Sequence, residues 1–295
     1  MLQTLFIRHK ERIAQGFAFI QKGPHNESMY NKPLNRTLNI NEDAAIVRPT
    51  DAQDEIRTNR RAGVRGFTKF GYRETLQAAT GEQTIWATTG NFTPMTTAST
   101  FTITYTNTSD GSTANGAKTL YFDYVDSDGL PAQATHTLGS SGSDVTSFSG
   151  LGLNRVAVSS SGSTQTNGAA ITITDTTGAT TQGIIPTGQG VTQQAIFHVG
   201  SNHDGVAKYL WINCNKLSGS NPKVVFKGLV FNRAVETIFE VFRCTVDTSV
   251  VNFVEISEPI GFNLSPSDVL YFVADTDQNN TIAAIRFSLN EYSRS

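Results

Sequence analysis

The sequence predicts an all-β protein: two antiparallel β-sandwich or jelly-roll-like domains preceded by an extended, partly helical N-terminal arm. Charged residues make up only 16% of the 295 residues, below the roughly 25% typical of soluble domains. Thr, Ser, Asn and Gly take their place, and Thr suits half-exposed strands because it is β-branched and polar. Beyond residue 90, short alternating segments are separated by turn-rich sequence, which indicates antiparallel sheets instead of alternating βαβ units.

Residues 1–66 are predicted to form the docking arm. Their apolar residues have only approximate helical spacing, interrupted by Gly16, and residues 23–51 show no sustained period. Residues 1–75 contain 13 Lys and Arg against 8 Asp and Glu, a net charge of +5, whereas the remainder carries −7. We expect the arm to become ordered on an acidic surface such as a neighbouring copy. The alternative is a solvated arm whose positive charge is incidental.

Residues 67–190 are predicted to form the first sandwich. Phe101, Ile103 and Tyr105 alternate with threonines, which is the pattern of a half-buried strand. A second strand is expected at 118–126, followed by a hairpin turn at 127–129. Further strands are expected at 133–138, 144–148, 154–160 and 169–174.

Residues 191–295 are predicted to form a second, more apolar sandwich after a connector at 184–190. No repeat of 20–50 residues is present, which argues against a solenoid, propeller or fibre shaft. Strands are expected at 195–200, 207–214, 223–231, 237–246, 251–256, 268–275 and 282–292.

The two cysteines, Cys214 and Cys244, lie in apolar strand sequence and are expected to be buried free thiols. The apolar residues 5–7 are followed at once by charged residues, so we expect no signal peptide. No apolar run approaches the roughly 18 residues of a membrane helix, so no membrane insertion is expected. The net charge of −2 predicts no nucleic-acid binding.

One group of side chains has ligand-like density, and two turns faintly resemble a calcium loop. His198, His203 and Asp204 lie close together, but a turn between strands explains Asn, His, Asp and Gly there for backbone reasons. Two Asp-rich turns have the 1-3-5 spacing of a calcium loop but lack the closing Glu. We interpret these turns as hairpins and leave weak calcium binding open; their residues are Asp123, Asp126 and Asp128, then Asp275, Asp277 and Asn279.

Nothing in the sequence indicates catalysis. Glu236 and Glu240 could form a carboxylate pair, but solvation of a strand edge explains them better. Gly188-Gln189-Gly190 has no third glycine and no helix after it, so it is no nucleotide-binding loop. We therefore predict no catalytic, cofactor-binding or metal-binding residues and no enzyme activity. Aromatic residues such as Trp211, Phe239 and Phe242 are expected in cores, although a few exposed Tyr could stack on sugars.

Residues 67–295 resemble a family of virion structural proteins from tailed phages, common in marine and cyanobacterial viruses. The similarity lies in Phe70-Gly71, then Gln83-Thr84-Ile85-Trp86, then Gly90-Asn91-Phe92, and in the turn-and-strand patterns of 109–129 and 267–292. The family tends to have Glu where this chain has Gln83, and the arm at 1–66 departs from the family. The resemblance carries no functional residues.

This resemblance implies a non-enzymatic accessory component of a bacteriophage virion, synthesised in the host cytoplasm. We expect it in head decoration, neck or tail, held to other virion proteins through its arm and assembled as a homo-oligomer, with a trimer as the guess from the class. The alternative is a fibre or spike adhesin that binds a host surface glycan or protein. A glycan-degrading enzyme is a third, weaker alternative. Cofactors are expected in none of these.

Overall fold

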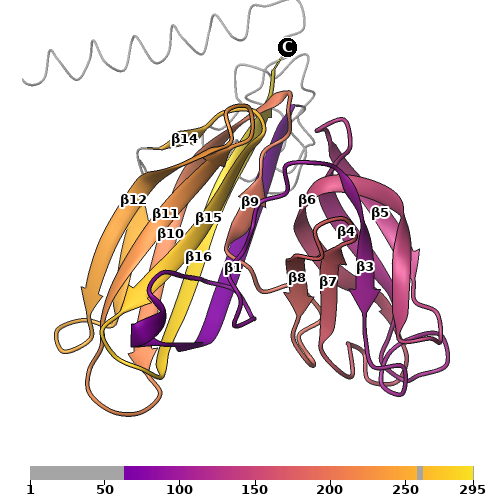
Figure 1. The fold of residues 1–295 in the computed structure, drawn as a ribbon, viewed down its shortest axis with the longest axis horizontal. Helices are drawn as coiled ribbons and strands as arrows, with labels where there is room; N and C mark the ends of the chain where they lie inside the picture. Colours follow the sequence, from indigo (N-terminus) through magenta and orange to yellow (C-terminus); the bar gives the residue numbers. More distant parts are fainter. Residues whose placement is uncertain (1–62, 258–261, 295) are drawn as a thin grey trace, which may run out of the picture. The chain divides into compact units, whose positions relative to one another are not determined.

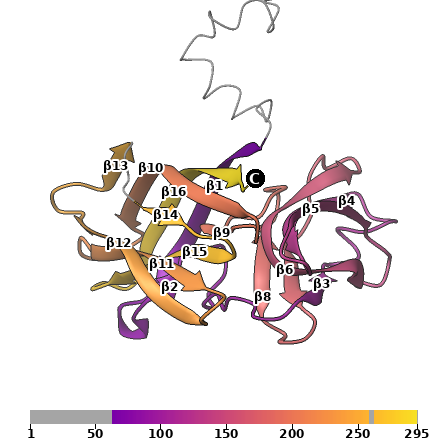
Figure 2. The same ribbon diagram turned by 90° about the horizontal axis from the view of Figure 1, so that it is seen from above.

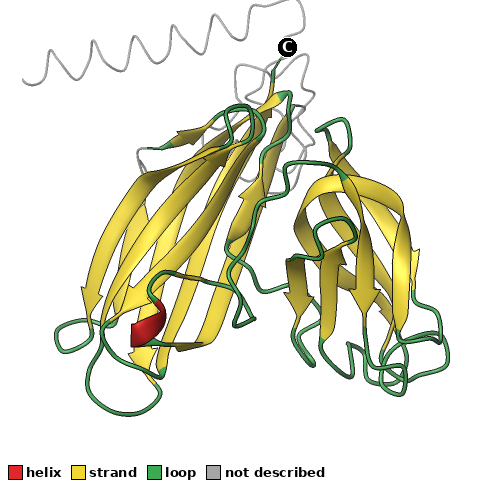
Figure 3. Ribbon diagram, in the orientation of Figure 1, coloured by secondary structure: helices red, strands yellow, loops and turns green. Residues whose placement is uncertain are grey.

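The computed structural model describes residues 63–257 and 262–294, and the predicted arm lies outside them except for its last residues. The prediction of an all-β protein is confirmed: strands make up the described chain, with one short 3-10 helix, η3 (Ala78–Thr80) (Figure 3). The strands are β1 Val64–Leu76, β2 Gln83–Thr84, β3 Ser99–Thr104, β4 Ala117–Asp126, β5 Pro131–Thr137, β6 Ser143–Ser161, β7 Ile171–Asp175, β8 Thr181–Ile185, β9 Ile196–His198, β10 His203–Lys216, β11 Lys223–Asn232, β12 Thr237–Asp247, β13 Phe253–Ser257, β14 Asn263–Leu264, β15 Asp268–Thr276 and β16 Thr281–Ser293.

Two antiparallel sheets pack face to face as a β-sandwich (Figure 1). Sheet A has the order β1-β16-β10-β13, with β14 beside β10, and sheet B has the order β12-β11-β15-β2, with β9 beside β15. Alternate residues of the central strands point between the sheets, because side chains of a strand alternate between faces. The resulting core contains Leu210 and Ile212 of β10, Phe226 of β11, Phe272 of β15 and Phe287 of β16.

The remaining strands form one six-stranded antiparallel sheet, ordered β5-β4-β6-β3-β7-β8. This sheet curls around its own core (Figure 2), so the strands of 99–185 enclose apolar side chains with one sheet, where we had expected two facing sheets. β6 explains part of the difference: its 19 residues combine the two strands expected at 144–148 and 154–160. The core takes one or more residues from five strands, among them Phe101, Phe122, Val156, Ile173 and Ile185.

The predicted boundary between the two domains needs a correction at its N-terminal side. β1 pairs with β16 along almost its whole length, and β2 pairs with β15, so both belong to the sandwich of the C-terminal half. The six-stranded sheet is therefore an insertion between β2 and β9 of the sandwich. The sequence does not show the apolar alternation of a strand at β1. Its buried, inward positions include Lys69 and Arg73, where apolar residues are the norm.

Other expectations are confirmed or corrected within the sandwich. Both cysteines are free as expected; Cys214 is buried, whereas Cys244 is only half-buried. Trp211 does not lie in a core: it is half-exposed and alternates with the buried Leu210 and Ile212, so it points away from the core. Phe239 is 46% exposed because it lies on the edge strand β12.

Candidate functional site

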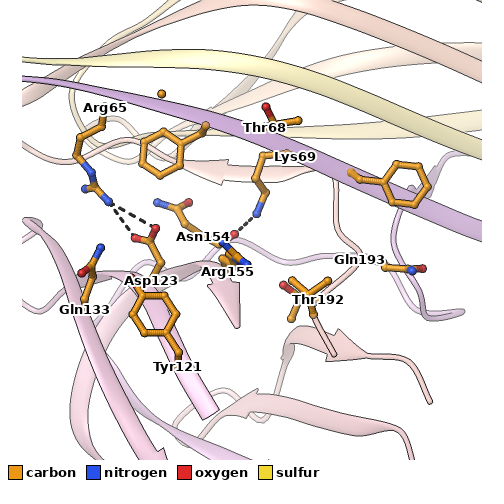
Figure 4. Close-up of a pocket in the computed structure, with 14 residues that line it drawn as sticks. Arg65, Thr68, Lys69, Tyr121, Asp123, Gln133, Asn154, Arg155, Thr192 and Gln193 are labelled. Carbon is orange, nitrogen blue, oxygen red and sulfur yellow. Dashed lines mark hydrogen bonds and ion pairs between the residues drawn. The ribbon is translucent and has the colours of Figure 1, made fainter. Parts of the chain in front are cut away.

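A cavity of about 490 Å³ lies beside the free edge of β1, where this strand faces β4, β5 and β6 of the six-stranded sheet. Figure 4 shows Arg65 of β1 directed toward Asp123 of β4 and Lys69 of β1 directed toward Asn154 of β6, with Arg155 of β6 beside them. Gln133 of β5 lies on the other side of Asp123. We call this the junction cavity. Charged side chains from distant parts of the described chain converge around this hollow.

One wall of the junction cavity carries an ion pair. The Arg65 guanidinium donates to the Asp123 carboxylate, with Nη2 3.2 Å from Oδ1, and its Nη1 lies 3.5 Å from Oε2 of Glu291. The same guanidinium lies 4.8 Å from the ring centre of Phe67. Burial raises the pKa of Asp123, and the charges of Arg65 and Lys69 oppose that rise. Arg65 therefore has two carboxylate partners and is not free to bind a third anion strongly.

Lys69 is the most deeply buried cation of this site. Its side chain is 7% exposed, and its amine donates to the backbone carbonyl of Asn154. Burial lowers the pKa of Lys69 to about 7, although the charge of Asp123 acts in the opposite direction. An ammonium has three N–H donors, and among the described residues Asn154 is its one hydrogen-bond acceptor. Two donors thus remain without a protein partner in a residue that lines the cavity.

Arg155 supplies a third cation. It lies directly opposite Asp123 in the pairing of β4 with β6, and it is exposed. Its guanidinium makes no hydrogen bond or ion pair with another residue in the described parts of the chain. The charge of Arg155 opposes the rise in the pKa of Asp123, but the Asp123 carboxylate forms its ion pair with Arg65. Arg155 is therefore available to a ligand.

The walls of the cavity are fixed by hydrogen bonds between β6 and the sandwich. The Asn154 side chain bonds both backbone groups of His198, with Oδ1 accepting at 2.7 Å and Nδ2 donating at 3.0 Å. Gln194 donates to the carbonyl of Leu153 at 3.0 Å, and Arg233 donates to that of Leu151 at 2.9 Å. These bonds satisfy the side of β6 that β4 leaves unpaired, so the cavity is preformed.

The histidine patch that the sequence singled out does not assemble. His198 is 1% exposed, and its Nδ1 lies 3.4 Å from Nη2 of Arg233. Burial and the charge of Arg233 lower the pKa of His198 well below its ordinary value. Asp204 instead forms a bidentate ion pair with Arg294, at 2.6 and 2.9 Å. The cluster HVGSNHD therefore serves packing and a turn.

The Asp-rich turns also separate. Asp123 pairs with Arg65, whereas Asp126 accepts the backbone N–H groups of Asp128 and Leu130, as a hairpin turn requires. In the second turn, Asp277 accepts the N–H of Lys223 and Asn279 accepts that of Ala78. Across residues 63–257 and 262–294, no group of three or more His, Cys, Asp or Glu is placed to hold a metal.

The proposed carboxylate pair does not share a strand face. Glu236 lies in the turn before β12 with φ of 51°, while Glu240 lies on β12 and forms an ion pair with Arg243 at 2.7 Å. Both side chains are exposed. The geometry gives them no role as a catalytic pair.

Residues 83–92, which carry part of the resemblance, form a folded loop against the outer face of sheet B. Trp86 and Phe92 pack on Tyr271 and its neighbours, and Trp86 donates from Nε1 to the carbonyl of Gly90 at 2.7 Å. Arg73 is 4% exposed and donates to the carbonyls of Thr84, Thr89 and Gly90. A Cβ at Gly71 would lie 2.4 Å from the carbonyl oxygen of Ile85, which explains the glycine of Phe70-Gly71. The motif is structural.

The outer face of sheet A presents aromatic and charged side chains. The strand register places Phe70, Arg286, Trp211 and Glu255 in one row across β1, β16, β10 and β13. The row on one side of it contains Tyr72 and Phe253, and the row on its other side contains Tyr209. Phe70 is 39% and Phe253 53% exposed, and Tyr72, Tyr209 and Trp211 are half-exposed. We call these residues the aromatic face.

Sequence reasoning missed the junction cavity and the aromatic face. A signal existed in residues 64–76, where Arg65, Lys69 and Arg73 recur at spacings of four, which places all of them on one face of a strand. Cations on the inward face of a strand need partners, so they mark a polar junction.

The sequence and the fold were each compared with those of known proteins. No family model and no curated protein matches the sequence. A structure of broad bean stain virus matches this chain at 8% sequence identity with a TM-score of 0.19. The match covers 71% of this chain and 88% of the virus chain. A structure of infectious bursal disease virus, Gt strain, covers 79% and 82% at 8% identity, with a TM-score of 0.13.

A crystal structure of the infectious bursal disease virus VP2 subviral particle covers 77% of this chain and 80% of its own at 8% identity, with a TM-score of 0.12. Likeness at these TM-scores supports no statement about function. In the described ranges, no helix is long and apolar enough to cross a membrane.

Proposed function

We propose that this chain is a non-enzymatic structural protein of a bacteriophage virion, an accessory component held by protein–protein contacts. The observation that carries the proposal is the aromatic face of sheet A. Interfaces are enriched in Tyr, Trp, Phe and Arg relative to other surface, and Trp, Tyr and Arg dominate binding energy where they are central. The face offers these residues on the rigid, central strands β10 and β16 and the edge strands β1 and β13.

The sequence resemblance at 67–295 supports placing that interface in a virion. We infer that the protein forms a homo-oligomer, with a trimer as our working state, and that it contacts other virion proteins at head, neck or tail. The charge of +5 on residues 1–75 against −7 on the remainder supports contacts between the basic segment and an acidic neighbour. Residues 1–66 are the arm that we propose makes them.

The arm is tested by deleting residues 1–60. We expect a folded, soluble body that no longer incorporates into particles, measured by circular dichroism and by mass spectrometry of purified virions. Normal incorporation of the shortened chain would refute docking through the arm. A body that fails to fold would instead show that the arm belongs to the folded unit.

The aromatic face is tested by Trp211→Ser and by Arg286→Glu. Both positions point outward, so we expect folding to be retained. Self-association and incorporation should fall about tenfold or more, because a central Trp or Arg contributes about 2 kcal/mol to a typical interface. Arg243→Glu, at an exposed position on β12, is the matched control. Unchanged assembly in both test variants would contradict the proposal.

A second proposed function is an adhesin that binds a host surface glycan. Its support is the junction cavity, which combines a free guanidinium, a buried amine and several amide side chains in a preformed hollow.

A further inference from the structure

We propose that the junction cavity binds a carboxylate-bearing sugar unit, of the uronic or sialic acid class, with Arg155 and Lys69 as the groups that recognise its carboxylate. This assignment deepens the second proposed function, the adhesin, and does not depend on the structural one. It follows from the charge, the unsatisfied donors and the lining of the cavity.

The charge of the site favours an anion. Arg65, Lys69 and Arg155 line the cavity together with one carboxylate, that of Asp123, and Arg65 also pairs with Glu291 behind the lining. These three cations and two carboxylates leave one positive charge over when Lys69 is protonated. Such a surplus in the wall of a hollow attracts a negatively charged ligand.

The buried amine strengthens this inference. Two N–H donors of Lys69 lack a protein acceptor in the described chain although the side chain is 7% exposed. A buried donor without a partner costs about 1–3 kcal/mol. A carboxylate oxygen would satisfy it with a charge-assisted hydrogen bond, and a planar guanidinium such as that of Arg155 binds carboxylates bidentately.

The remaining lining fits a sugar ring better than a small inorganic anion. Gln133 and Gln193 offer amide donors and acceptors, and Tyr121 offers aromatic surface. Hydroxyl groups of a sugar need such paired donors and acceptors, whereas its C–H faces pack on aromatic rings. The volume of about 490 Å³ lies within the range of ligand pockets, roughly 300–1,000 Å³.

The test uses the full-length chain and four probes: sodium glucuronate, N-acetylneuraminate, glucose and acetate. Binding is measured by saturation-transfer NMR and by calorimetry. We expect at least one of the acidic sugars to bind about tenfold more tightly than glucose and acetate. Equal binding of glucose would overturn the role of the carboxylate, equal binding of acetate would overturn the sugar class, and no binding of any probe would overturn the proposal.

Variants locate the site. Arg155→Gln removes an exposed side chain, so the fold should be retained while affinity for the acidic sugar falls about tenfold or more. Arg286→Gln is the matched control, because that exposed arginine lies on the outer face of the neighbouring strand β16 and does not line the cavity. Equal losses in both variants would show attraction by overall charge and refute the site.

Protonation gives a second, independent readout. An anion beside Lys69 raises the pKa of its amine from about 7, so binding should take up a proton and weaken from about pH 6 to about pH 9. Arg65, Arg155 and Asp123, whose carboxyl pKa burial raises, also face the amine. In Lys69→Met the pH dependence should vanish. A pH dependence that persists in this variant would refute the role of Lys69.

The experiments can refute the adhesin proposal without refuting the structural proposal, and the reverse. Loss of sugar binding in Arg155→Gln with normal particle incorporation would support the cavity and leave the aromatic face untouched. Trp211→Ser should show the reverse pattern.

Discussion

The β-sandwich and the six-stranded sheet are both antiparallel, yet they are built from the sequence in different ways. The six-stranded sheet uses one continuous segment, from β3 to β8. The sandwich needs residues from both sides of that segment, since β1 and β2 pair with β16 and β15. The difference shows that chain order alone does not divide this protein into folding units.

The two regions also satisfy buried polar groups differently. In the six-stranded sheet, carboxylates hold the turns: Asp110 is fully buried and accepts three backbone N–H groups, and Asp175 accepts those of Gly178 and Thr180. In the sandwich, Glu291 likewise accepts a backbone N–H, that of Gly200. There the cations Lys69 and Arg73 of β1 also donate to backbone carbonyls. Carboxylates accept hydrogen bonds from backbone N–H groups that have no strand partner, and cations donate to backbone carbonyls that have none, because a carboxylate can only accept and a cation can only donate.

The largest predicted effect is a difference in folding between isolated fragments of the two regions. A fragment of residues 94–191 retains all six strands and should fold, whereas a fragment of 191–295 should not. The second fragment lacks β1 and the core residues Leu76 and Ile85, which leaves the edge of β16 unpaired. Dispersion of amide NMR signals measures both outcomes.

A joined chain is the matched control for this prediction. Linking residues 63–93 directly to 194–295 restores β1 and β2 and should restore a folded sandwich. A folded 191–295 fragment would show that the C-terminal strands form an independent domain, as the sequence had first suggested.

Asp110→Ala should destabilise the six-stranded sheet by about 3–5 kcal/mol, because three N–H groups, one buried and two partly buried, lose a charged acceptor. The bonds are to Ala117 and Gly168 at 2.8 Å and to Ala169 at 2.9 Å. Urea unfolding gives the free energy, and hydrogen exchange at these amides gives its location. Asp110→Asn keeps Oδ1, which accepts two of the bonds, and should lose less. Equal stability of the Ala variant and the parent would refute the role of this carboxylate.

Strand positions were largely predictable, and tertiary pairing was not. Alternation of apolar residues located β4, and apolar content located β11 and β15, each within a few residues. β1 escaped because Lys69, Gly71 and Arg73 occupy its inward positions, where close approach and carbonyl binding replace apolar packing. The role of Asp110 also escaped, since Gly168 and Ala169 lie 58 and 59 residues away in sequence.

The candidate site was even less predictable, because its parts come from four strands and a connector. Asp123 was noted for calcium-like spacing, but its partner Arg65 lies 58 residues earlier, in the predicted arm. Trp211 was assigned to a core by its apolar neighbours, whereas the bulge between Ala207 and Tyr209 and the register with Arg286 place it outward. A local pattern gives the strand, but the face that stays uncovered depends on which other strands stack on it.

The smallest predicted effect concerns the pH dependence of the junction where the two regions meet. The pKa of Lys69 is about 7 in the folded protein against an ordinary 10.5, so the unfolded chain binds more protons between these values. Stability therefore rises with pH there, by about 2 kcal/mol from about pH 7 to about pH 9, since one proton contributes at most about 1.4 kcal/mol per pH unit. Below about pH 7 the amine is charged in both states and the full cost of burying it persists. Subtracting the unfolding free energies of Lys69→Met from those of the parent isolates this contribution from Asp123 and Arg155, which face the same amine. A flat difference between the two curves would mean that water or an anion already solvates the amine in the cavity, and the junction would then be far less strained than its burial implies.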